Sequence, residues 1–133
     1  MLDIAELLRI NVHFIEISSR TYENEIIIDS RLTTEEQWED FAHELGHVLF
    51  QHGNQILHIN SLFLEYQEWK ANNFALHFCV PTFMLQKSLI KYKIANIPEG
   101  IPLIRNKFNV THEIAEKRLN HFRNQLQISK SLQ

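Results

Sequence analysis

The chain has 133 residues, of which 44% are hydrophobic, and a formal net charge of −3. This length predicts a single domain with its own core, and the absence of a basic block argues against a nucleic-acid-binding surface. No stretch approaches about 18 uninterrupted apolar residues, and the N-terminus lacks the apolar run of a signal peptide, so we expect neither a membrane span nor secretion.

The first 30 residues predict a short helix and two strands. Residues 3–10 have the spacing of an amphipathic helix, and residues 12–17 and 25–29 have strand-like composition, with Asn24 as a turn former between them. We expect the strands to pair as a small antiparallel sheet. Its edge could hold an extended peptide by strand addition, and a purely structural hairpin is the equal alternative.

The next segment predicts a helix over residues 34–51, with Gly53 as its stop. Thr33 and Thr34 offer N-cap hydroxyls, and Glu36 follows in capping-box register. Apolar residues then recur at helical spacing. They are Trp38, Phe41, Ala42, Leu45, Val48 and Leu49.

A histidine pair lies on this predicted helix. His43 and His47 are four residues apart, so their imidazoles lie on one face and can converge on one cation. Glu44 follows the first histidine, which completes the H-E-x-x-H arrangement of zinc peptidases, with the glutamate as the general base. The alternative is a histidine pair on a solvated face, which the apolar neighbours and Glu44 disfavour.

A second amphipathic helix is predicted over residues 64–79, and it offers a third ligand. A catalytic zinc site takes three protein ligands, and we favour Glu68, with Glu65 as the fallback. Asn72, one turn beyond Glu68, can hydrogen-bond to a ligand histidine. Two small residues allow close approach to the first helix: Ala71 and Ala75. Cys79 predicts a buried, reduced thiol in a cytoplasmic protein.

The C-terminal third predicts more helices. Residues 83–92 have a helical pattern, and residues 98–102 form a Pro/Gly cluster that we interpret as a break. Residues 103–111 and 112–126 predict a helical pair with the spacing of a helix-turn-helix. DNA binding is one interpretation, but basic residues are few and mixed with acidic ones. We therefore expect the pair to pack on the catalytic core.

Three segments together resemble a known family. Residues 42–47 read AHELGH, residues 68–75 read EWKANNFA, and Pro81 follows. This combination resembles the ImmA/IrrE metallopeptidases, whose pattern is an A-H-E-L-G-H helix, a later E-x-x-A-N-x-F-A helix and a closing proline. The resemblance covers about residues 1–122 and implies an α+β, mostly helical, zincin-like fold.

The resemblance also implies a function. Carried over by position, His43, His47 and Glu68 are the metal ligands and Glu44 is the general base. Two imidazoles and a carboxylate favour one zinc ion per chain, with manganese not excluded. Members of the family act on helix-turn-helix repressors of prophages and mobile elements, so we expect a zinc endopeptidase with such a protein substrate, and neither a nucleic acid nor a membrane as a direct partner.

One departure from the family pattern concerns the end of the first helix. Many members have a histidine four residues after the second ligand, where this chain has Gln51, and His52 follows. We interpret His52 as a surface residue or one that supports a ligand. A peptidase also needs a donor for the oxyanion, and four candidates remain: His58, Tyr66, His77 and Tyr92.

The expected organisation is a single domain over residues 1–133, with a catalytic core at 1–97 and the helical pair at 98–126. Two other functions compete with the peptidase. One is a regulatory module that binds a repressor or DNA through the C-terminal helices without cleaving it, and a base at Glu44 argues against it. The other is a toxin–antitoxin partner, which the sequence neither supports nor excludes.

Overall fold

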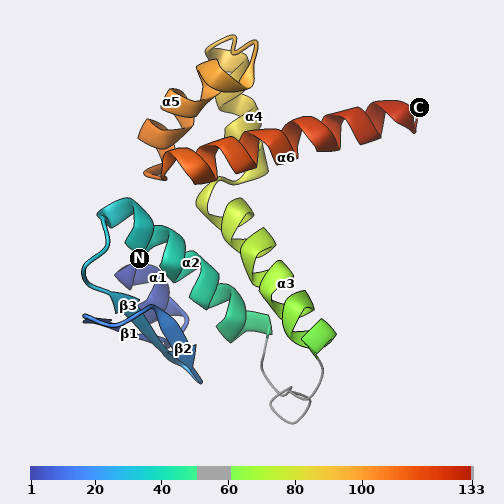
Figure 1. The fold of residues 1–133 in the computed structure, drawn as a ribbon. Coiled ribbons are helices and arrows are strands. Elements are labelled where there is room, and N and C mark those ends of the chain that lie inside the picture. Colours follow the sequence, from blue (N-terminus) through green and yellow to red (C-terminus); the bar gives the residue numbers. More distant parts are fainter. Residues whose placement is uncertain (51–60, 133) are drawn as a thin grey trace. The chain divides into compact units, whose positions relative to one another are not determined.

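The computed structural model describes residues 1–50 and 61–132, and the chain divides into two compact units, Met1–Ala75 and Leu76–Gln133 (Figure 1). The helices are α1 (Leu2–Leu7), α2 (Thr34–Phe50), α3 (Ser61–Cys79), α4 (Thr82–Lys91), α5 (Ile97–Phe108) and α6 (His112–Ser131). The strands are β1 (Asn11–Ile15), β2 (Arg20–Tyr22) and β3 (Glu25–Asp29). This mostly helical α+β architecture with a small sheet confirms the predicted fold class. The predicted boundary at residue 98 lies within the second unit.

The sheet is mixed, with the strand order β1-β3-β2. The two strands expected from the sequence, β1 and β3, pair in parallel, so the predicted antiparallel pairing is wrong for them. The reason is the unpredicted strand β2, which forms the antiparallel partner of β3 through a tight turn. In that turn Glu23 has a φ of 54°, and the Thr21 hydroxyl donates to the Glu25 carbonyl at 3.0 Å.

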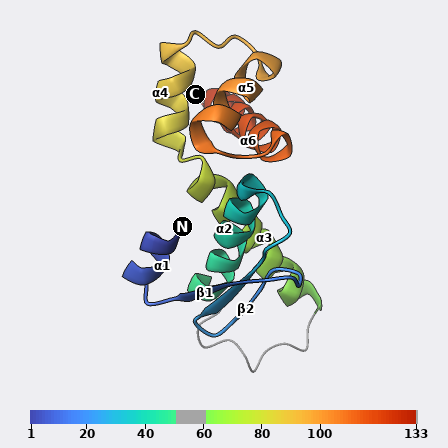
Figure 2. The same cartoon turned by 90° about the vertical axis from the view of Figure 1, so that its left-hand side faces the viewer.

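Helix α2 packs on one face of this sheet (Figure 2). Ile26 and Ile28 of β3 point to that face and are fully buried. From α2 the buried apolar residues are Phe41, Ala42, Leu45 and Val48. Alternation in the strand and helical periodicity in α2 therefore meet at one core. Burial of this core fixes the rotation of α2 about its own axis. That rotation in turn sets the direction in which His43 and His47 point.

The start of α2 is set by a reciprocal cap. The Glu36 amide donates to the Thr33 hydroxyl at 3.3 Å, and the Thr33 amide donates to the Glu36 carboxylate at 2.9 Å. This is the predicted capping box, in which two otherwise unpaired N–H groups are satisfied. The described part of α2 ends at Phe50, so the predicted stop at Gly53 lies outside the described residues.

In the second unit, α5 begins earlier than predicted, and the Pro/Gly cluster is part of it. The Asn96 side chain caps the helix by accepting from the Glu99 amide at 3.0 Å. Pro98 then falls in the first turn, where a missing N–H costs nothing. Pro102 lies one turn later, and the bond it lacks would have gone to the Pro98 carbonyl. The interpretation of residues 98–102 as a break is therefore wrong.

Helix α6 is joined to α5 by a short turn in which Asn109 adopts a left-handed conformation. The Thr111 hydroxyl accepts from the Ile114 amide at 3.3 Å and so caps α6. Arg118, also of α6, is fully buried, and it donates to the Val80 carbonyl at 2.9 Å and to the Thr82 hydroxyl at 2.7 Å. None of the helices within residues 1–50 and 61–132 has the length and apolarity needed to cross a bilayer.

Candidate metal centre

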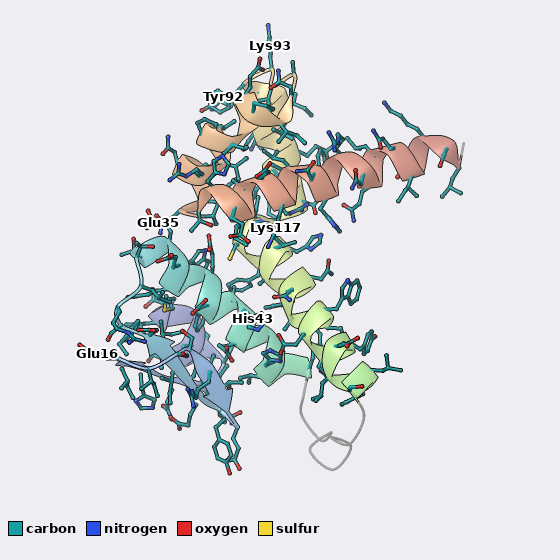
Figure 3. The ribbon with its side chains drawn as sticks, in the orientation of Figure 1. Glu16, Glu35, His43, Tyr92, Lys93 and Lys117 are labelled. Atoms are coloured by element: carbon teal, nitrogen blue, oxygen red, sulfur yellow. The ribbon has the colours of Figure 1, made fainter. Side chains whose placement is uncertain are left out.

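Three side chains of the first unit converge between α2 and α3. The Nε2 atoms of His43 and His47 lie 3.0 Å apart. The Glu68 carboxylate, from α3, has one oxygen 2.9 Å from Nε2 of His47 and the other 3.4 Å from Nε2 of His43. Figure 3 shows the His43 side chain projecting from α2 toward α3. Among the described residues, these three form the group of ligand-type side chains that could hold a metal ion.

The spacing of these atoms fits a small tetrahedral cation. Zinc–nitrogen and zinc–oxygen bonds of about 2.0–2.1 Å place neighbouring ligand atoms about 3.3 Å apart around a tetrahedron. The separation of 3.0 Å between the two histidine nitrogens is close to that value, as are the 2.9 and 3.4 Å that join them to two different oxygens of Glu68. Burial lowers the pKa of His47, and the neighbouring His43 lowers it further against the raising effect of Glu68. A neutral imidazole keeps the lone pair that a metal needs.

Glu44 lies on α2 beside this group and is 8% exposed. Burial, together with the carboxylates of Asp40 and Glu68, raises the pKa of its carboxyl group to about 7 against the lowering effect of Arg20. A carboxyl group with a pKa near neutrality can both accept and return a proton. The predicted general base therefore has the surroundings that the role requires.

Glu68 reaches the histidines because α2 and α3 approach each other at two small residues. A Cβ atom added at Gly46 would lie 3.1 Å from the Cα of Ala71 and 3.1 Å from the ring of Phe74. Ala71 is itself 1% exposed. The prediction that a small residue on α3 permits close approach is confirmed at Ala71, and Gly46 supplies the matching gap on α2. Both lie within one turn of a residue of the candidate metal centre.

The other described residues singled out from the sequence are not part of this group. Glu65 is exposed, and among the described residues it does not join the ligand cluster. Asn72 is exposed as well, and its contact with a ligand histidine stays a prediction. Tyr66 stacks on Trp69. His77 and Tyr92 belong to the second unit, and three further positions lie outside the described residues: Gln51, His52 and His58.

Two side chains that influence Glu44 were missed in the sequence. Asp40 lies one helical turn before Glu44, and that i,i+4 spacing of two acids was a usable signal. Arg20 lies on β2, a strand of three residues with no apolar alternation, so no local pattern indicated it. Gly46 was seen as part of the motif, but its role as a contact point depends on α3, which is far away in sequence.

The comparisons with known proteins cover most of the chain, including the residues of the candidate metal centre. The family model Peptidase_M78, described as the IrrE N-terminal-like domain, matches residues 6–120. The chain is 44% identical over 127 residues to the phage-like element PBSX protein XkdA of Bacillus subtilis, a match that covers 92% of this chain and 62% of that protein. It is 33% identical over 121 residues to the uncharacterized protein YqaB of the same organism, covering 88% and 68%. The chain thus spans about two thirds of the length of these relatives.

Proposed function

Because this chain belongs to the Peptidase_M78 family of IrrE N-terminal-like domains, we propose that it is a zinc-dependent endopeptidase whose substrate is a helix-turn-helix repressor of a phage-like or other mobile element. The convergence of His43, His47 and Glu68 beside the buried Glu44 is the observation that carries the enzymatic part. The repressor as substrate is supported by the family resemblance and by the similarity to XkdA, which is named as a protein of a phage-like element.

The residues divide the chemistry between them. His43, His47 and Glu68 would hold a divalent cation, which when bound polarises a peptide carbonyl and acidifies water. Glu44 accepts the proton of the attacking water, and it then delivers that proton to the leaving amine. Burial of Glu44 raises the pKa of its carboxyl group, which favours return of the proton to the leaving amine.

The first test separates the base from the ligands. Glu44→Gln keeps the shape of the side chain but cannot accept a proton, so we expect cleavage to fall by roughly 10²–10⁴-fold while bound zinc is retained. Purified repressor from the same element is incubated with each protein and the fragments are followed on a gel. Glu6→Gln, on the exposed surface of α1, is the matched control. Equal cleavage by the wild type and Glu44→Gln removes Glu44 from the mechanism.

The second test concerns the ligands. His43→Ala, His47→Ala and Glu68→Ala should each lose stoichiometric zinc, measured by elemental analysis of protein purified without chelator. Glu65→Ala, one turn away on α3, is the matched control and should retain it. Zinc retention by Glu68→Ala together with its loss from Glu65→Ala would move the third ligand to Glu65. Repressor binding without cleavage by a zinc-loaded wild type would favour the regulatory-module alternative.

A further inference from the structure

Two large aromatic side chains lie on the surface of α3. Tyr66 and Trp69 stack with their ring centroids 6.2 Å apart and their planes 12° from parallel. Although they stack on each other, Tyr66 is 54% exposed and Trp69 is 61% exposed. Aromatic side chains are costly to leave in water, and tryptophan and tyrosine are the residues that most often dominate protein binding surfaces. A surface role for the pair accounts for their exposure better than a role in the core.

The pair is continuous with the candidate metal centre. On α3, Trp69 directly follows Glu68. Glu65 lies three positions before Glu68 and four positions before Trp69. At 100° per residue, Glu65 lies on the helix surface between Glu68 and Trp69. The exposed face of α3 therefore presents, in order around the helix, a metal-ligand carboxylate, a second carboxylate and an aromatic ring.

The chemistry of this face favours a cation. The ammonium group of Lys70 already lies over two rings of the first unit, 4.6 Å from the centroid of Phe50 and 5.4 Å from that of Tyr66. The larger ring of Trp69 is the better acceptor for such a contact. A guanidinium group suits the face more closely than an ammonium group, because it can stack flat on the indole while it donates to the carboxylate of Glu65.

We propose that Glu65, Tyr66 and Trp69 form a subsite for an arginine side chain of the protein substrate, beside the bond that is cut. The proposal rests on the proposed function for its ligand, since the metal centre is what makes a peptide chain the occupant of this face. Glu65 supplies a negative charge for the guanidinium, and Asp40 and Glu68 add acidic character near the candidate centre, where Arg20 and Lys70 are the basic residues. Arginine near the cleaved bond is thus a feature of the substrate that this chain selects.

Binding can be measured without any cleavage, through the emission of Trp69 itself. The chain has two tryptophans, and Trp38→Phe leaves Trp69 as the sole reporter. The probe is an acetylated, amidated heptapeptide with arginine at its centre and alanine and leucine elsewhere; the comparison peptide carries glutamine instead. We expect a saturable change in emission with the arginine peptide and about two- to fivefold weaker binding of the glutamine peptide, the size of an exposed cation–π contact of about 0.5–1 kcal/mol.

Variants test whether the residues of the proposed subsite cause the preference for the arginine peptide. Glu65→Gln and Tyr66→Leu should each weaken binding of the arginine peptide by a similar factor, while Tyr22→Leu, which changes an exposed tyrosine on β2, should not. Equal affinity for the two peptides, or no saturable change in emission, overturns the proposal. Self-association of the wild type that is abolished by Trp69→Ala also overturns the proposal, because the subsite would then bind a second copy of the chain.

Failure of the subsite and failure of the proposed function can be told apart. The titration is run on chelated protein and on zinc-loaded protein, and neither readout depends on catalysis. Selective arginine binding together with an inactive zinc-loaded wild type would leave the subsite standing and reject the peptidase. Loss of cleavage in Glu44→Gln without any selectivity for arginine would do the reverse.

Discussion

Helix α2 buries the carboxyl group of Glu44, whereas α6 buries the guanidinium group of Arg118, and the surroundings of these two groups differ. Arg118 donates to the Val80 carbonyl and the Thr82 hydroxyl, so its own unit supplies acceptors. Glu44 instead has two carboxylates, those of Asp40 and Glu68, among its neighbours, and its pKa rises to about 7. Neutral acceptors thus hold the guanidinium of Arg118 in the fold, whereas the acidic neighbours of Glu44, opposed by Arg20, keep its carboxyl group protonated to a higher pH.

The largest expected effect on stability is at Arg118. Arg118→Ala leaves a cavity and removes the donor to the buried Val80 carbonyl and to the Thr82 hydroxyl, so the free energy of unfolding should fall by about 3–5 kcal/mol. Arg118→Met fills most of the volume and avoids burying a charge, so its loss should be smaller. Urea unfolding followed by circular dichroism measures both. If Arg118→Ala changes stability by less than about 1 kcal/mol, Arg118 does not have the structural role assigned to it here.

The surroundings of Glu44 predict that the stability of the fold depends on pH. Its pKa is about 7 in the fold against an ordinary 4.5, so the folded chain holds the proton where the unfolded chain has released it. The free energy of unfolding of the metal-free protein should therefore fall as the pH rises from about 4.5 to 7, by on the order of 1–3 kcal/mol. Glu44→Gln should lack this component.

The comparison is made by urea unfolding of chelated wild type and Glu44→Gln at pH 5 and pH 8. Burial also lowers the pKa of His47, which removes stability as the pH falls, but that contribution is common to both proteins. The difference between them therefore reports on Glu44. A difference that does not change with pH would contradict the assignment.

The contact between α2 and α3 predicts a more local effect. In Gly46→Ala the new methyl group would lie 3.1 Å from the Cα of Ala71, which is backbone and cannot turn aside. We expect a loss of about 1–3 kcal/mol of stability from this overpacking, and weaker zinc affinity because Glu68 moves away from the histidines. Zinc titration with a competing chelator measures the second effect. Unchanged affinity would show that the close approach is not what positions Glu68.

The smallest expected effect concerns helix caps. Thr111→Ala removes the hydroxyl that accepts from the Ile114 amide, which should cost about 1 kcal/mol. Zinc affinity should not change, because Thr111 belongs to the second unit. Thermal unfolding and the same chelator titration test the two parts of this prediction. A loss of zinc affinity in Thr111→Ala would show that the second unit influences the metal centre.

The features predicted correctly from the sequence were mainly local ones. His43, Glu44 and His47 fall on one helix, so spacing alone places them together, and the Thr33 cap is read within four residues. Glu68 needed the helical pattern of a second segment and the family resemblance. The three side chains that converge were therefore predictable before their distances were known, and their role as metal ligands stays a prediction.

What could not be predicted depends on contacts between distant segments. Strand pairing depends on which strands become neighbours in the sheet. In sequence β2 lies between β1 and β3, and its Arg20 and Thr21 give no apolar signal that would indicate a strand. The start of α5 was missed because Pro98 and Pro102 are typical of a break, whereas the Asn96 cap places Pro98 in the first turn. In both cases the local pattern was real, and its context decided the outcome.

The origin of the three ligands also has a consequence for metal exchange. Helix α2 alone presents His43 and His47, so an unfolded or partly folded chain retains two donors with only weak affinity, whereas Glu68 joins them only when α3 packs on α2. Metal affinity and folding are then linked by mass action. Above the dissociation constant, each tenfold rise in free zinc should add about 1.4 kcal/mol to the free energy of unfolding. For a zinc-loaded centre, the concentration of free zinc would then help to set the fraction of the protein that is folded.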